Sequence, residues 1–314
     1  MSILKSLLIV AVLALLGAAL LYVVAPGTFV DLAISAERRA AGLEKHEVEI
    51  PGFTVQYLDS EGTGAPLLLL HGFGADKDNW TRVSRSLHKH YRVIAPDLPG
   101  YGESDGPTDV PYTIASQVER VRAFVTALGL THVHIGGNSM GGAISAAYAA
   151  AYPNEVGSLW LLAPAGVGSA PTSELGHLLE ASDGRNPLIA ETPEEFDALI
   201  HFAMEKPPYM PAAVIRVLSD RAIAAQPLRN QQFKDIISEG LTLEPLISDL
   251  PIPTHILWGD SDRLLHVGGA DVLARILPNA SKTIMKDIGH LPMMEAPELS
   301  AEDYLRFRQT LSAT

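Results

Sequence analysis

The sequence contains no cysteine among its 314 residues. Disulfides, thiolate nucleophiles and zinc–thiolate sites are therefore excluded, and any covalent chemistry must use another side chain. Basic residues are also scarce, because 23 Lys and Arg stand against 36 Asp and Glu and give a formal net charge of −13. Nucleic-acid binding needs clustered Lys and Arg, so we exclude a nucleic-acid partner.

The length and composition favour one large domain with a small appendage. The chain has 47% hydrophobic residues, with 22 prolines and 26 glycines spread along it. This composition is typical of a globular protein with many turns. We find no internal repeat and expect one main hydrophobic core.

The amino-terminal segment carries no charge from Leu7 to Ala25. A helix of that length spans about 28 Å, close to the ~30 Å hydrocarbon thickness of a bilayer. We therefore predict a transmembrane anchor over residues 7–25, after a short tail of residues 1–6. The alternative is a cleaved signal peptide, but its apolar region is typically only about 7 to 15 residues long. Pro26 also follows the one plausible small-residue cleavage site and would hinder a protease that binds extended backbone.

Residues 26–45 read as an amphipathic juxtamembrane helix, with apolar residues at near-helical spacing opposite charged residues such as Asp31 and Arg38. This helix could lie on the bilayer surface, pair with a second copy in a homodimer, or pack on its own domain. The tail before the anchor offers only Lys5 and the α-amine as positive charges. Because this tail is so short, we favour a main domain outside the cytoplasm. The expected location is a bacterial inner membrane, with a single-pass anchor and the main domain in the periplasm.

After residue 46, apolar runs alternate with amphipathic ones. The predicted strands are 47–50, 53–58, 67–70, 91–95, 132–136, 156–162, 254–258 and 281–285. The predicted helices lie near 80–89, 113–128, 140–151, 268–277 and 297–310. Fully apolar strands such as Leu67–Leu70 suit a sheet covered on both faces. The pattern predicts a mostly parallel α/β architecture with active loops at the carboxyl ends of the strands.

The interval from 167 to 250 breaks this rhythm, because prolines punctuate several short helical stretches and no convincing strand is present. We interpret residues 167–250 as a helical cap inserted into a core formed by residues 46–166 and 251–314. Aromatic side chains of the cap either line a substrate entrance or pack within the cap itself. They include Phe196, Phe202, Tyr209 and Phe233.

Ser139 stands in the run Gly137-Asn138-Ser139-Met140-Gly141. A serine hydroxyl is a weak nucleophile until a base removes its proton, and one solution places the serine on a strained turn between a strand and a helix. Such a turn needs small neighbours, which Gly137 and Gly141 provide. A predicted strand precedes the run and an Ala-rich helix follows it. We predict that Ser139 is a catalytic nucleophile, and the alternative is an ordinary glycine-rich turn.

Acyl transfer also needs hydrogen-bond donors for the negative oxygen of the tetrahedral intermediate. The candidates are the backbone N–H groups of Met140, directly after the nucleophile, and Phe73, in the loop after the third strand. Phe73 lies in His71-Gly72-Phe73-Gly74, where the glycines let the backbone approach a ligand closely. We interpret His71 as a structural histidine, since the expected chain order places the base after the acid.

The expected order of serine, acid and histidine is completed near the carboxyl terminus. His290 follows the last predicted strand and is the candidate general base, able to take the Ser139 proton and return it to the leaving group. Two carboxylates, Asp260 and Asp262, follow the strand that ends at Trp258. Either one could hold the imidazole tautomer and stabilise its cation.

With these motifs, residues 47–312 resemble the α/β-hydrolase superfamily. The motifs that carry the resemblance are His71-Gly72-Phe73-Gly74, Asp97-Leu98-Pro99-Gly100-Tyr101-Gly102-Glu103-Ser104, Gly137-Asn138-Ser139-Met140-Gly141, Trp258-Gly259-Asp260-Ser261-Asp262 and Gly289-His290. In that family the acid is the fourth residue after the strand-ending tryptophan, which implies Asp262 rather than Asp260. The resemblance implies an eight-stranded, mostly parallel sheet flanked by helices, a Ser139–Asp262–His290 triad, and no metal or organic cofactor.

The chain is more closely similar to the membrane-anchored monoacylglycerol lipases and their bacterial lipase and phospholipase A relatives. The leading anchor and the segments 71–80, 138–142 and 187–195 carry this closer likeness. It implies a membrane-tethered serine carboxylesterase that cleaves acyl chains from monoacylglycerols, lysophospholipids or phospholipids. Two alternatives stay open, namely a carbon–carbon bond hydrolase of aromatic degradation and a non-catalytic protein that uses the pocket for binding only.

Overall fold

The computed structural model describes residues 2–240 and 242–312. Met1 of the predicted tail, Leu241 of the predicted cap and residues 313–314 at the end of the predicted core lie outside the described residues.

An eight-stranded sheet forms the centre of the molecule, in the spatial order β1-β2-β4-β3-β5-β6-β7-β8. The strands are β1 Glu44–Ile50, β2 Phe53–Asp59, β3 Ala65–Leu70, β4 Tyr91–Pro96, β5 Val133–Ser139, β6 Val156–Pro164, β7 Thr254–Gly259 and β8 Ala280–Met285. Strands β3 to β8 pair in parallel, whereas β2 is antiparallel to both of its neighbours. The prediction of a mostly parallel, eight-stranded sheet is confirmed.

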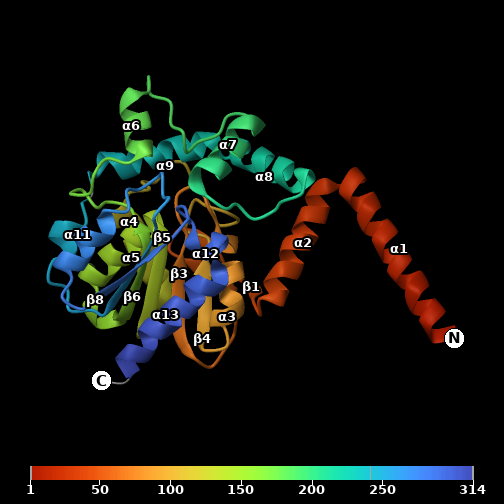
Figure 1. Ribbon diagram of the computed structural model, residues 1–314, viewed down its shortest axis with the longest axis horizontal. Coiled ribbons are helices and arrows are strands. Elements are labelled where there is room, and N and C mark those ends of the chain that lie inside the picture. The colour runs from red at the N-terminus through yellow and green to blue at the C-terminus, as the bar shows by residue number, and fades with distance from the viewer. Residues whose placement is uncertain (1, 241, 313–314) are drawn as a thin grey trace.

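Helices cover both faces of the sheet (Figure 1). One face packs against α4 Ile114–Ala127, α5 Met140–Ala151 and α11 Gly269–Ile276, and the other against α3 Thr81–Leu87, α12 Pro292–Glu295 and α13 Pro297–Ser312. The leucines of β3 show why a fully apolar strand is needed here. Leu68 and Leu70 belong to the first core, and Leu67 and Leu69 to the second, because successive side chains of a strand point to opposite faces.

The insert between β6 and β7 is helical throughout its described secondary structure. Its helices are α6 Glu174–Ala181, α7 Pro193–Ala203, α8 Ala212–Ala224, α9 Gln226–Ser238 and α10 Glu244–Ile247. In Figure 1, α6 to α9 lie across one end of the sheet. The two ends of the insert meet at its base, where the Glu244 carboxylate accepts hydrogen bonds from the backbone N–H groups of Gly168 and Ser169 at 3.2 and 2.7 Å.

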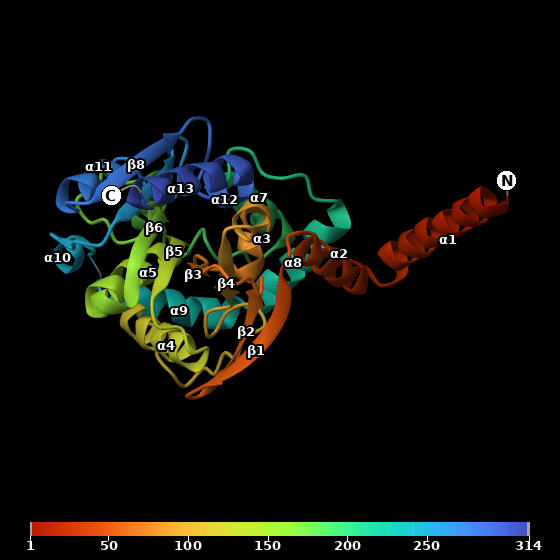
Figure 2. The ribbon, with the colours of Figure 1, turned by 90° about the horizontal axis from the view of Figure 1, so that it is seen from below.

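Two helices precede the sheet, α1 Ser2–Val24 and α2 Pro26–Ala40. Figures 1 and 2 both show α1 projecting away from the rest of the molecule. Helix α2 lies on the domain, where Arg38 makes a bidentate pair with Asp78 at 2.6 Å and Asp31 pairs with Arg221 of α8 at 2.6 Å. Of the three alternatives for this segment, the described residues therefore show packing on its own domain.

The predicted transmembrane anchor over residues 7–25 is not supported. Residues 7–24 lie in α1, and Ala25 directly follows it. Within the described part of the chain, however, no helix combines the length and the apolar character needed to cross a membrane. The uncharged run correctly indicated a helix, since apolar residues without Pro favour one. A segment can form a helix without having the length and apolar character needed to span a bilayer.

Candidate active site

Ser139 sits at the junction where β5 ends and α5 begins, with φ 55° and ψ −118°. A non-glycine residue with positive φ stores about 1–3 kcal/mol of strain and persists only where its surroundings enforce it. The flanking glycines permit the close packing of the backbone around it. A Cβ atom on Gly137 would lie 2.2 Å from the Gly141 carbonyl oxygen, and one on Gly141 would lie 2.2 Å from that of Leu70. The structure therefore places Ser139 on the strained turn expected of an activated serine.

Hydrogen bonds on either side of Ser139 hold this turn against neighbouring segments. The Ser139 carbonyl accepts from the Ala165 N–H at 2.9 Å. The Asn138 amide donates to the carbonyl oxygens of Leu162, at 3.1 Å, and His290, at 2.9 Å. Asn138 thus brings the His290 segment beside the turn, a role that its place in the serine motif did not reveal.

His290 and Asp262 form a buried pair, with 2.7 Å between Nδ1 and Oδ2 and side chains 4% and 0% exposed. The other carboxylate oxygen of Asp262 accepts from the N–H groups of Leu264 and Leu265, both at 2.9 Å. Because an ionised carboxylate can only accept, Nδ1 carries the imidazole proton and Nε2 carries the free lone pair. Nε2 is buried and has no hydrogen-bond partner within the described residues, so it is available as a base.

Asp260, the rival carboxylate, is exposed. Its Oδ1 accepts from the Asp287 N–H at 2.7 Å and from the Ser261 hydroxyl at 2.9 Å. It therefore braces the loop after β7, and Asp262 is the carboxylate that the structure brings to His290. Across residues 2–240 and 242–312, no group of three or more His, Asp or Glu side chains could hold a metal ion.

The loop after β3 lies directly against the serine. A Cβ atom on Gly72 would be 3.2 Å from Ser139 Cβ, so a larger residue would push the loop and the serine apart by a few tenths of an ångström. Phe73 follows, with its ring 5.6 Å from that of Phe233 and 6.2 Å from that of Tyr101. Met140 begins α5, where backbone N–H groups have no intrahelical acceptor. Both candidate oxyanion donors thus border the nucleophile.

His71 supports this loop from beneath. Its Nδ1 donates to the Gly72 carbonyl at 2.8 Å, and its Nε2 accepts from the Leu98 N–H at 3.0 Å. Burial lowers the pKa of His71 to about 4, so the ring is neutral at physiological pH. The structure agrees with its interpretation as a structural histidine.

A group of charges adjoins the same loop, with Lys77 and Asp97 buried and Glu103 about half exposed. The Lys77 ammonium lies 2.5 Å from Asp97 and 2.8 Å from Glu103, and Asp97 also accepts from the backbone N–H groups of Lys77 and Glu103 at 2.8 Å. Burial alone would raise the pKa of Glu103, but the hydrogen bond and charge of Lys77 outweigh it and lower that pKa to about 2. We call residues 71–74, which contain the candidate donor Phe73, the oxyanion loop. The bonds of Lys77 join the segment after this loop to the segment after β4.

Asp76 lies beside this group, and its raised pKa predicts that the free energy of unfolding falls as the pH rises. Burial, together with the charges of Asp78 and Asp97, raises the pKa of Asp76 from 3.8 to about 7. The folded state therefore holds a proton that the unfolded state loses, and this contribution to stability is present below about pH 4 and is lost as the pH rises through about 7. We expect Asp76→Asn to gain stability relative to the natural protein between pH 5 and pH 8, measured by urea unfolding.

The control for this prediction is Asp109→Asn, which changes an exposed carboxylate on the loop before α4. Its difference from the natural protein should be nearly the same at both pH values. An equally constant difference for Asp76→Asn would contradict the prediction.

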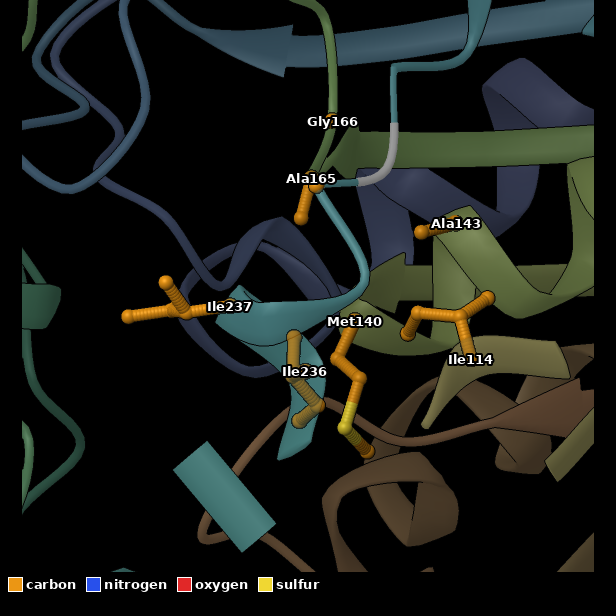
Figure 3. Close-up of a pocket in the computed structure, with 8 residues that line it drawn as sticks. Ile114, Met140, Ala143, Ala165, Gly166, Ile236 and Ile237 are labelled. Atoms are coloured by element: carbon orange, nitrogen blue, oxygen red, sulfur yellow. The ribbon is translucent and has the colours of Figure 1, made fainter. Parts of the chain in front are cut away.

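A pocket of about 210 Å³ lies beside Met140. Its lining carries only apolar side chains or none and consists of Ile114, Met140, Ala143, Ala165, Gly166, Ile236, Ile237 and Gly240. Figure 3 shows Met140 between Ile236 and Ile114. Ile237 is 57% exposed and marks the solvent side. The sequence pattern could not identify this pocket, because its walls come from α4, α5, α9 and the loop after β6.

The cap aromatics Phe233, Phe202 and Tyr209 take different positions. Phe233 reaches the oxyanion loop, as its contact with Phe73 shows. Phe202 packs under the Arg263 guanidinium, 4.6 Å from its ring centre, and Tyr209 is 89% exposed. Of these three, only Phe233 touches the loop beside the nucleophile.

Comparisons with known proteins agree with this geometry. Residues 65–205 match the family model described as alpha/beta hydrolase fold. Lipase 1 of Psychrobacter immobilis is 39% identical over 286 residues, covering 89% of each chain, and human monoacylglycerol lipase ABHD6 is 31% identical over 88% of this chain and 86% of its own. The crystal structure of a membrane phospholipase A, described as a bacterial virulence factor, has a TM-score of 0.90 and 41% identity, covering 99% of this chain and all of that one. The chain belongs to the α/β-hydrolase family, among its serine ester hydrolases.

Proposed function

We propose that this protein hydrolyses acyl esters of lipids through a Ser139–His290–Asp262 triad and an acyl-enzyme intermediate. Two features together carry the proposal. One is a serine at φ 55°, flanked by Gly137 and Gly141, where no side chain would fit. The other is a buried His290–Asp262 pair at 2.7 Å, formed by the loops after β8 and β7. Strained serine and oriented base are the two requirements for nucleophilic acyl transfer.

In the first half of the reaction, Ser139 Oγ attacks the ester carbonyl carbon while its proton passes to His290 Nε2. The backbone N–H groups of Phe73 and Met140 stabilise the resulting oxyanion. When the intermediate collapses, the alcohol leaves with the proton from Nε2, and the acyl group stays on Ser139. Water then repeats the sequence and releases the fatty acid. Asp262 keeps Nδ1 protonated and stabilises the imidazolium at each stage.

The apolar pocket supports an acyl chain as the part of the substrate that is bound. Its lining carries no charge, and Met140 on its wall is the residue after the nucleophile. Apolar pockets with few polar groups bind hydrocarbon by burying its surface. The similar proteins are named lipase, monoacylglycerol lipase and phospholipase A, which favours acylglycerols, lysophospholipids or phospholipids as the substrate class.

Filling this pocket is expected to shorten the preferred acyl chain. Ala143 lies on the pocket wall and is 1% exposed, so Ala143→Leu would occupy space that we assign to the chain. We expect kcat/KM for octanoyl and longer esters to fall about ten- to hundredfold, as small changes in apolar pockets do, while acetyl esters change little. Kinetics on a chain-length series of p-nitrophenyl esters would measure this.

The matched control is Ala151→Leu, at the exposed end of the same helix. It should leave the chain-length profile unchanged. A uniform loss over all chain lengths in Ala143→Leu would count against an acyl chain in this pocket.

The experiment that tests the whole proposal is hydrolysis of a panel of monoacylglycerols, lysophospholipids and phospholipids by the purified protein, together with labelling by a fluorophosphonate probe. We expect lipid turnover and label on Ser139. Turnover of vinylogous diketones instead of esters would favour the carbon–carbon bond hydrolase. No label and no turnover would favour the non-catalytic alternative and refute the proposal.

Pairing of two copies through residues 26–45 stays a prediction. The predicted inner-membrane location rested on the transmembrane anchor and loses that support. The membrane phospholipase A that the chain resembles over 99% of its length is described as a membrane protein, which favours action on lipids at a membrane. Release or retention of the full chain in washed membranes would test this association.

A further inference from the structure

The backbone around His290 is held by an unusual set of acceptors. Three successive N–H groups are all bonded: those of Gly289 and Leu291 donate to the Glu295 carboxylate at 3.0 and 3.2 Å, and that of His290 donates to the Ala203 carbonyl of the cap at 2.8 Å. One carboxylate therefore brackets the histidine from both sides.

The same carboxylate also binds the cap. Glu295 Oε2 accepts from the N–H groups of Glu205 and Lys206, both at 2.9 Å, just after α7 ends. Four backbone donors from two distant segments thus converge on Glu295. Oε2 accepts three of these bonds and Oε1 accepts the fourth, from Leu291. A glutamine would offer one oxygen and turn an NH₂ group, which cannot accept, toward at least one donor.

The two segments approach each other as closely as backbone allows. A Cβ atom on Gly289 would lie 2.8 Å from both the Ala203 carbonyl oxygen and the Glu205 nitrogen. No side chain fits between the His290 loop and the cap, so the hydrogen bonds to Glu295 and Ala203 fix their separation. A shift of the cap segment would move the backbone that carries the imidazole.

A simpler explanation is that Glu295 only caps α12. It does reach back to the Leu291 N–H, at the start of that four-residue helix. Capping of α12 does not require the two bonds to Glu205 and Lys206, which lie about 90 positions earlier in the chain. The contacts across the chain therefore need a second role.

We propose that Glu295 is a positioning residue that fixes the His290 loop and docks the cap segment 203–206 onto it. The inference rests on the proposed function, since it treats His290 as the base. Through Glu295, any change in the position of the cap segment also changes the position of the imidazole. Glu295 itself contacts neither substrate nor the reacting atoms.

The test compares Glu295→Gln with the control Glu298→Gln, an exposed glutamate three positions along the chain. We expect kcat per labelled site to fall about ten- to hundredfold in Glu295→Gln, as a displacement near 1 Å does, for p-nitrophenyl acetate and octanoate alike. The rate of fluorophosphonate labelling should fall in parallel, with KM changing less than about threefold. Glu298→Gln should match the natural protein. Melting temperatures establish that each variant is folded.

A purely structural role would lower the melting temperature of Glu295→Gln but leave kcat per labelled site unchanged, and that result would overturn the inference. A loss confined to KM would overturn it as well. If Glu295→Gln does not fold, Glu295→Asp is measured instead, because it keeps the charge but is one methylene shorter. An unchanged kcat in Glu295→Asp would also overturn the inference. A natural protein that is neither labelled nor active would refute the proposed function, whereas equal rates in an active pair refute this inference alone.

Discussion

Replacement of Ser139 by alanine is expected to lower kcat for ester hydrolysis by about 10⁶-fold, the loss typical when a triad serine is removed. The hydroxyl supplies the only covalent attachment point in the proposed reaction, and the neighbouring carbonyl, amide and oxyanion contacts do not depend on it. The variant should therefore fold normally and bind substrate. Steady-state kinetics on an octanoyl ester, with circular dichroism and thermal unfolding, would measure both properties.

Ser248→Ala is a suitable control, because that hydroxyl is exposed at the end of α10 and donates to the Glu244 carbonyl at 2.7 Å. It should retain full activity and full fluorophosphonate labelling. Residual turnover of more than a few per cent in Ser139→Ala, in protein free of contaminating esterase, would place the nucleophile elsewhere.

Asp262→Asn is expected to lower kcat by about 10⁴-fold at neutral pH. One oxygen of Asp262 accepts from Leu264 and Leu265 while the other accepts from His290. An asparagine oxygen that keeps the two loop bonds must turn its NH₂ group toward His290 Nδ1. The imidazole then accepts at Nδ1 and carries its proton on Nε2, where it can no longer remove a proton from Ser139.

Asp260→Asn provides a matched comparison, since it removes the same charge two residues earlier. Within the described residues the Asp260 carboxylate accepts from Ser261 and Asp287, so its loss should cost less than about tenfold in kcat and act through stability. The reverse ranking of the two variants would assign the acid to Asp260 and contradict the geometry described above. Both variants should be purified and assayed in parallel, so that their kcat values are compared under the same conditions.

The sequence predicted the centre of the sheet because its central strands are buried on both faces. Runs such as Leu67–Leu70 have few conformations open to them other than a central strand, and all eight predicted strands occur within a few residues of their observed bounds. Ser139 and His290 were predicted for a related reason. Each stands at the end of a recognisable strand, so local pattern fixed its place at the carboxyl edge.

Features that depend on contacts between distant segments could not be predicted. The packing of α2 on its own domain depends on Arg38 and Asp31, whose partners lie 40 and 190 positions away. The transmembrane interpretation of residues 7–25 relied on local hydrophobicity and is not supported. Glu295 gave no signal at all, because a glutamate at the end of a short helix is ordinary until its distant donors are seen.

The closed base of the helical insert has an evolutionary consequence. Its ends leave and rejoin the sheet side by side, joined by Glu244 to Gly168 and Ser169 and by the Leu243 N–H to the Gly166 carbonyl at 2.7 Å. A single continuous stretch of gene therefore encodes the whole helical insert at the end of the sheet that carries Ser139. Recombination or insertion within that stretch can alter which esters are admitted while the register of every strand stays the same, so the catalytic framework and its substrate range are free to diverge at different rates.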